Sequence, residues 1–89
     1  MSFDGTDLEG QRVVVLGGTS GIGLATAAAA AIAGADVTVV SNRKASVERA
    51  LAELPAGTAG YPVDLTDTAA VRTLFGDLGD IDHLVFTAG

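Results

Sequence analysis

The chain has 89 residues and a net charge of −6, so it has room for one small domain and lacks the basic character of a nucleic-acid-binding protein. Hydrophobic residues make up 48%, which excludes a disordered composition, and cysteine is absent, which excludes disulfides and zinc–thiolate sites. The acidic first ten residues do not resemble a signal peptide, and glycines interrupt the longest uncharged run, residues 13–35. We therefore expect a cytoplasmic protein without a membrane-spanning segment.

Short β-branched runs alternate with helical patterns along the whole chain. The predicted strands are residues 12–16, 36–41, 60–63 and 81–87. The predicted helices are residues 22–33, 46–54 and 67–76, with Ser46 and Thr66 as the expected N-caps of the second and third. Such alternation predicts parallel pairing through right-handed crossovers in the strand order 3-2-1-4. The predicted fold class is α/β, the first half of a Rossmann-type doubly wound parallel sheet, in one unit covering residues 1–89.

A glycine-rich loop, GGTSGIG, lies between the first predicted strand and the first predicted helix. Gly17 would allow a tight turn after the strand, Gly21 would let the backbone approach a pyrophosphate, and Gly23 would let the helix pack on the sheet. The phosphates would then lie at the helix N-terminus, where free N–H groups and the helix dipole favour anions. The alternative is a glycine-rich turn that binds nothing.

The spacing of the glycines distinguishes this loop from two others. A GxGxxG fingerprint starting at Gly21 needs a glycine where Thr26 stands. A Walker A loop starting at Gly18 needs a lysine where Leu24 stands, which argues against ATPase or GTPase chemistry. The pattern that remains is GxxxGxG.

Three segments together, GGTSGIG at 17–23, VDLTD at 63–67 and LVFTAG at 84–89, resemble motifs of the short-chain dehydrogenase/reductase family in the same order. The resemblance implies an NAD(P)-dependent oxidoreductase that transfers hydride between the nicotinamide and a small-molecule alcohol or carbonyl substrate. It also implies a homo-oligomer when the protein is intact. Leu16 replaces the threonine of the family's TGxxxGIG loop, and Phe86 and Thr87 replace two asparagines, so side-chain contacts of both motifs are in question.

The resemblance also implies which residues contact the cofactor. Asp64 would bind the adenine amine through its carboxylate, and Leu65 would bind the ring through its backbone. For Asp64 the alternative is a turn or cap residue before Thr66. The remaining implied contacts come from the glycine loop and from the end of the fourth strand: Gly17, Thr19, Ser20, Gly21, Ile22, Gly23, Ala88 and Gly89.

The segment after the second predicted strand bears on the choice of cofactor. An NAD site usually has an acidic residue about twenty positions beyond the glycine loop. This chain has Ser41, Asn42, Arg43 and Lys44 there. Arg43, helped by Lys44 and next to Asn42, could bind a 2′-phosphate through charge-assisted hydrogen bonds, so we expect NADP rather than NAD. The alternative is that both cations are ordinary solvated loop residues.

The sequence contains no candidate catalytic residue and no metal-binding cluster. The family's serine and Tyr-x-x-x-Lys pair have no counterpart, because Tyr61 is followed four positions later by Leu65, and His83 has the pattern of a structural residue. We expect the cofactor-binding half of a longer reductase, truncated before its catalytic half. The alternative is a natural short chain that acts as a non-catalytic nucleotide-binding or interaction module. An apolar strand edge at LVFTAG favours truncation.

Overall fold

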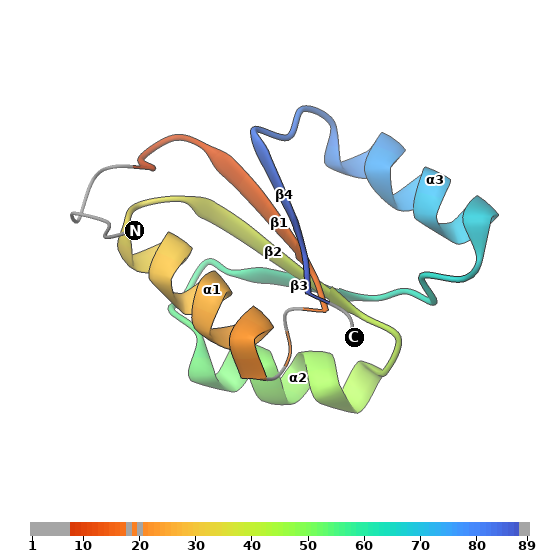
Figure 1. The fold of residues 1–89 in the computed structure, drawn as a ribbon, viewed down its shortest axis with the longest axis horizontal. Helices are drawn as coiled ribbons and strands as arrows, with labels where there is room; N and C mark the ends of the chain where they lie inside the picture. The colour runs from red at the N-terminus through yellow and green to blue at the C-terminus, as the bar shows by residue number, and fades with distance from the viewer. Residues whose placement is uncertain (1–7, 18, 20, 88–89) are drawn as a thin grey trace.

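The computed structural model describes residues 8–17, 19 and 21–87. Within them, four strands alternate with three helices (Figure 1), as the sequence predicts. In chain order they are β1 (Arg12–Leu16), α1 (Gly21–Ile32), β2 (Asp36–Ser41), α2 (Lys44–Glu53), β3 (Ala59–Pro62), α3 (Thr68–Leu78) and β4 (His83–Phe86).

The four strands form one parallel sheet in the order β3-β2-β1-β4. Val14 of the central strand β1 is paired with Thr38 of β2 on one side and with Leu84 of β4 on the other. The predicted Rossmann-type order 3-2-1-4 is therefore confirmed. Because all strands run the same way, their carboxyl ends meet at one edge of the sheet and their amino ends at the opposite edge.

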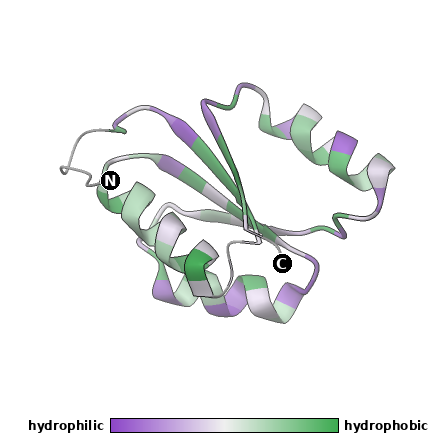
Figure 2. Ribbon diagram, viewed as in Figure 1, coloured by the Kyte–Doolittle hydropathy of each residue, from purple (hydrophilic) through white to green (hydrophobic). Residues whose placement is uncertain are grey.

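Helices cover both faces of the sheet. Helices α1 and α2 lie on one face and α3 on the other (Figure 1). Alternate residues of a strand point to opposite faces, so Val13 and Val15 pack under α1 and α2, whereas Val14 and Leu16 pack under α3. This two-sided burial explains the continuous apolar run of β1, which Figure 2 shows along the central strands.

The starts of α2 and α3 correct two predicted caps. Helix α2 begins at Lys44 with Arg43 at the N-cap position and no side-chain cap bond, so Ser46 lies inside the first turn. The apolar pattern identifies which face of this helix is buried but not where its first turn begins. At α3 the N-cap is Asp67, whose carboxylate accepts from the Ala70 N–H at 3.2 Å, because the hydroxyl of Thr66 is bound to Asp64 instead.

Other element bounds shift by a few residues. Helix α3 continues through Gly76 to Leu78 and ends at Gly79, whose φ of 72° favours glycine. None of the helices in the described part of the chain is long and apolar enough to cross a membrane. Strand β4 is an outermost strand of the sheet. Its residues Leu84 and Phe86 are 55% and 66% exposed, in agreement with the exposed apolar edge strand that the sequence predicts.

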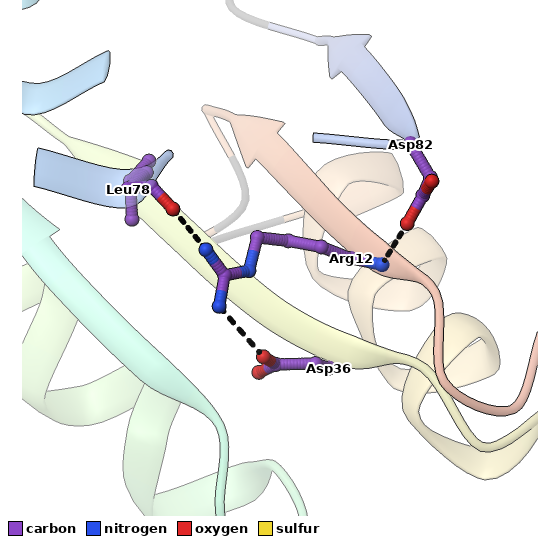
Figure 3. Close-up of polar contacts among 4 residues, drawn as sticks. All are labelled: Arg12, Asp36, Leu78 and Asp82. Carbon is purple, nitrogen blue, oxygen red and sulfur yellow. Dashed lines mark hydrogen bonds and ion pairs between the residues drawn. The ribbon is translucent and has the colours of Figure 1, made fainter. Parts of the chain in front are cut away.

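At the amino edge of the sheet, polar groups from four elements bind one another (Figure 3). The Arg12 guanidinium contacts Asp36 at 3.4 Å and donates to the carbonyl of Leu78 at the end of α3. The Arg12 backbone N–H donates to the Asp82 carboxylate at 2.8 Å. Nearby, His83 shares a hydrogen bond of 2.6 Å with Gln11. This edge therefore ties the starts of β1, β2 and β4 to α3.

Candidate cofactor-binding site

The candidate site lies at the carboxyl edge of the sheet, where the segments after the four strands come together. Hydrogen bonds continue the strand pairing past the strand ends: Gly17 donates to Val40 O at 2.7 Å, and Thr87 donates to Leu16 O at 2.9 Å. In the same way the Val63 N–H donates to Ser41 O at 2.7 Å. These bonds place the glycine loop beside the end of β4, and the β2–α2 connection beside the segment containing Asp64. In parallel α/β sheets this edge is where ligands bind.

Gly17 makes the tight turn that the sequence predicts. Its φ is 88°, in the left-handed region that favours glycine, directly after the last residue of β1. The chain can therefore leave β1 and reach the start of α1 within four residues.

Gly23 lies close to the residues that follow β1 and β4. A Cβ at this position would lie 2.3 Å from the carbonyl oxygen of Gly17 and 2.5 Å from the hydroxyl oxygen of Thr87. Gly23 itself is buried. The predicted role of this glycine in helix packing is therefore present in the structure.

The first turn of α1 is where the sequence predicts that an anion binds. Gly21, its first residue, is exposed with φ 56°, and a Cβ there would meet none of the described residues within 4 Å. No acidic residue occupies the first turn, which leaves the positive end of the helix dipole uncompensated. Ile22 beside it is 79% exposed, and Thr19 is half-buried. The predicted site residues Ser20, Ala88 and Gly89 lie outside the described residues.

The β2–α2 connection presents positive charge next to the segment after β3. Asn42, Arg43 and Lys44 are all exposed, and the first turn of α2 contains no acidic residue. Among the described residues, the ion pair found is the one between Arg12 and Asp36 at the opposite edge. Within residues 8–17, 19 and 21–87, the structure thus brings Arg43 and Asp64 to neighbouring segments and shows no ion pair of the Arg43 guanidinium.

Asp64 is held in a turn by Thr66. Its Oδ1 accepts from the Thr66 hydroxyl at 2.7 Å and from the Thr66 N–H at 2.9 Å. These two bonds lower the pKa of the Asp64 carboxyl below its ordinary value, and the bond from the Thr66 hydroxyl has the larger effect. The exposed carboxyl group is therefore ionised at neutral pH. Both bonds use Oδ1. The turn-residue interpretation of Asp64 therefore describes its local structure, and Oδ2 is not engaged by these bonds. Leu65 packs against the core under α3.

Thr87 is a residue whose contact the sequence analysis missed. Its hydroxyl donates to the carbonyl oxygens of Gly17 at 3.1 Å and Leu16 at 3.3 Å. The replacement of an asparagine at this position thus does not remove the side-chain link between β4 and β1. A hydroxyl at the end of the fourth predicted strand was the available signal. Its partners lie 70 and 71 positions away in sequence, where no local pattern points to them.

Comparison with known proteins identifies the family. The model of the short chain dehydrogenase family matches residues 11–89. A probable oxidoreductase of Streptomyces antibioticus is 45% identical over 93% of this chain and 30% of its own length. A solved structure of a short chain dehydrogenase/reductase family protein superposes with a TM-score of 0.89 and 39% identity, covering 94% of this chain and 36% of that one. The chain therefore belongs to the short-chain dehydrogenase family.

Members of this family are oxidoreductases that use NAD(P)(H), and similar solved structures contain either form. The complex of Pseudomonas aeruginosa RhlG with NADP is 32% identical with a TM-score of 0.82, over 92% of this chain and 36% of that one. The 3-ketoacyl-(acyl-carrier-protein) reductase of Brucella melitensis, complexed with NADH, is 30% identical with a TM-score of 0.73, over 88% of this chain and 34% of that one. The present chain spans about a third of the length of the curated relatives it matches.

Proposed function

We propose that the protein carrying this chain is an NADP(H)-dependent oxidoreductase that transfers hydride between the nicotinamide and an alcohol or carbonyl substrate. Residues 1–89 would form its cofactor-binding part. The observation that supports this most strongly is the packing of Gly23 on Gly17, where a Cβ would lie 2.3 Å from the Gly17 oxygen. That close contact brings the uncompensated start of α1 to the carboxyl edge of a parallel sheet, in a member of a dehydrogenase family.

In this proposal the pyrophosphate of the cofactor binds the glycine loop and the first turn of α1. The backbone at Gly21 offers open space for it, and an added side chain would occupy that space. The other loop residues proposed to contact the cofactor are Gly17, Thr19, Ser20, Ile22 and Gly23. Ala88 and Gly89, which follow Thr87, would contact the ribose.

The adenosine half would lie between the β2–α2 connection and the segment after β3. The bond from the Val63 N–H to Ser41 O, 2.7 Å long, keeps these two segments adjacent. Asp64 would accept from the adenine amine, and the backbone of Leu65 would contact the ring. The Asp64 carboxylate could accept this hydrogen bond through Oδ2, because the two bonds from Thr66 both go to Oδ1.

The cofactor is proposed to be NADP because of the charge at the β2–α2 connection. Arg43 is exposed, and the segment Ser41 to Lys44 contains no acidic residue of the kind that binds the ribose hydroxyls in an NAD site. Arg43 with Asn42 would instead bind the 2′-phosphate. The 89 residues contain no Tyr-x-x-x-Lys sequence. We therefore place the proton-transfer residues of the reaction outside this chain, and propose that this chain's residues bind and orient the cofactor.

The test compares two cofactors in one variant of the complete natural protein. Arg43→Ala should weaken NADPH binding by about tenfold to a hundredfold, because a charge-assisted hydrogen bond contributes roughly 1.5–3 kcal/mol. NADH, which lacks the 2′-phosphate, should bind almost unchanged. Calorimetric dissociation constants at low and moderate salt measure both effects, and Arg72→Ala, at an exposed position of α3, serves as the control.

Equal losses for both cofactors would contradict the NADP assignment and assign Arg43 a general structural role. Wild-type protein that binds neither cofactor would contradict the proposed function as a whole. Tight NADPH binding without turnover of any alcohol or carbonyl would favour a non-catalytic nucleotide-binding module.

A further inference from the structure

The hydroxyl of Thr87 connects the end of β4 to the first residue of the glycine loop. It lies 3.1 Å from the Gly17 carbonyl oxygen and 3.3 Å from that of Leu16, and Thr87 is half-buried. A hydroxyl has one proton to donate, and the shorter contact is the one to Gly17. The backbone N–H of Thr87 already satisfies Leu16 O at 2.9 Å. The Thr87 hydroxyl is therefore assigned as the donor to the Gly17 carbonyl oxygen, because the Leu16 oxygen already accepts from the Thr87 N–H.

Gly17 is held on both sides by neighbouring strands. Its N–H donates to Val40 O at 2.7 Å, at the end of β2, and its carbonyl accepts from Thr87 after β4. Its backbone adopts φ 88°, a conformation with which the loop begins. The Thr87 bond thus fixes the orientation of the peptide group at which the chain leaves the sheet.

Gly23, the last residue of the glycine loop, lies close to the same hydrogen bond between Thr87 and Gly17. The Cβ position of Gly23, in the first turn of α1, lies 2.5 Å from the Thr87 hydroxyl oxygen and 2.3 Å from the Gly17 carbonyl oxygen. The hydrogen bond from Thr87 to Gly17 therefore lies next to both the first and the last residue of the loop. If it were lost, the carbonyl of the half-buried Gly17 would lack this partner.

We propose that Thr87 is a positioning residue for the cofactor's pyrophosphate: its hydroxyl holds the Gly17 carbonyl so that the backbone of the glycine loop is preorganised for the anion. The inference rests on the proposed function, since it concerns the same cofactor site. Preorganisation raises affinity because the loop does not have to be ordered at the moment of binding. Leu16, which stands where the family's loop has a threonine, has an apolar side chain and cannot form such a hydrogen bond.

The test measures two ligands in the complete natural protein: NADPH, which contains the pyrophosphate, and adenosine 2′-monophosphate, which does not. Thr87→Val keeps the shape of the side chain and removes the hydroxyl. It should weaken NADPH binding by about twofold to tenfold, the range for one net hydrogen bond. Binding of adenosine 2′-monophosphate should not change, because its contacts would be at Arg43 and Asp64. Thr87→Ser should restore NADPH binding.

Three results separate this inference from its alternatives. Unchanged NADPH affinity in a folded Thr87→Val variant would overturn it, as would equal losses for both ligands, which would indicate a general structural role. If Thr87→Val does not fold, Thr87→Ala removes the hydroxyl without adding an atom near Gly17 and serves for the same measurement. Thr73→Val, at an exposed position of α3, is the matched control. Wild-type protein that fails to bind NADPH would contradict the proposed function instead.

Discussion

The two edges of the sheet differ in what their polar side chains contact. At the amino edge, Arg12 binds Asp36, Asp82 and the carbonyl of Leu78, so charged groups are satisfied within the protein (Figure 3). At the carboxyl edge, the segments are joined by backbone bonds and glycine contacts, while Arg43 is exposed. Charges that neutralise each other can hold elements together but have little left for a ligand. Under the proposed function the anion would bind at the carboxyl edge, where Arg43 is exposed and the first turn of α1 contains no acidic residue.

At the carboxyl edge, the close contact of Gly23 with Gly17 leaves no room for an added side-chain atom. Gly23→Ala would place a Cβ 2.3 Å from the Gly17 oxygen, against backbone rather than a flexible side chain. Overpacking of this kind costs about 1–3 kcal/mol, so the free energy of unfolding should fall by that amount. NADPH binding should also weaken, because Gly17 and α1 must move apart. Urea denaturation and calorimetry measure the two effects.

Gly76→Ala provides the control for this substitution. Gly76 lies inside α3, and a Cβ there would meet no atom of the described part of the chain within 4 Å. Replacement by alanine in a helix interior should stabilise the protein by about 0.5–1 kcal/mol. If Gly23→Ala behaved like Gly76→Ala, the close contact at the carboxyl edge would not exist as described.

The amino edge should respond differently, because a substitution there should lower stability without weakening NADPH binding. Arg12→Met keeps most of the side chain's apolar length and removes its bonds to Asp36 and Leu78. The ion pair is between side chains that are 36% and 54% exposed, so it contributes little, and the half-buried bond to Leu78 accounts for most of the effect. The free energy of unfolding should fall by about 1 kcal/mol.

The NADPH dissociation constant of Arg12→Met should equal that of the wild type within error. A large loss of cofactor affinity would show that the two edges are coupled through β1, and the contrast between them would fail. Asp36→Asn, which removes the charge of the partner and leaves the Leu78 bond, should cost less stability than Arg12→Met.

The sequence predicts this fold well because its signals are local. The valine-rich runs of β1 and β2 and the glycines at 17 and 23 identify the order of elements and the loop between them. What it could not predict depends on single bonds between distant or competing groups. The sequence predicts Thr66 as a helix cap, but the Thr66 hydroxyl donates to Asp64 instead. The partner of Thr87, Gly17, lies 70 residues away in sequence. Hydropathy patterns contain no information about such pairings.

Asp64 is the exception at the carboxyl edge, because its carboxylate is bound by a neighbour and still faces solvent. The Thr66 hydroxyl and N–H both donate to Oδ1 and keep the pKa of Asp64 below its ordinary value. Thr66→Val removes the hydroxyl, which is the larger cause, and leaves the N–H. The pKa of Asp64 should therefore rise in the variant but stay below the ordinary value, as a carboxyl-detected NMR titration would show. Thr73→Val should leave it unchanged.

The sign of the stability change follows from the lowered pKa. A carboxyl group whose pKa is lower in the folded than in the unfolded protein stabilises the fold above its unfolded pKa, and this contribution is lost as the pH falls through the folded pKa. Thr66→Val should thus be slightly less stable than wild type at neutral pH, and the difference should shrink on acidification. Addition of NADPH should shift the Asp64 resonance in the wild type if Oδ2 binds the adenine amine. An identical pKa of Asp64 in wild type and variant would show that the Thr66 hydroxyl does not hold the carboxylate.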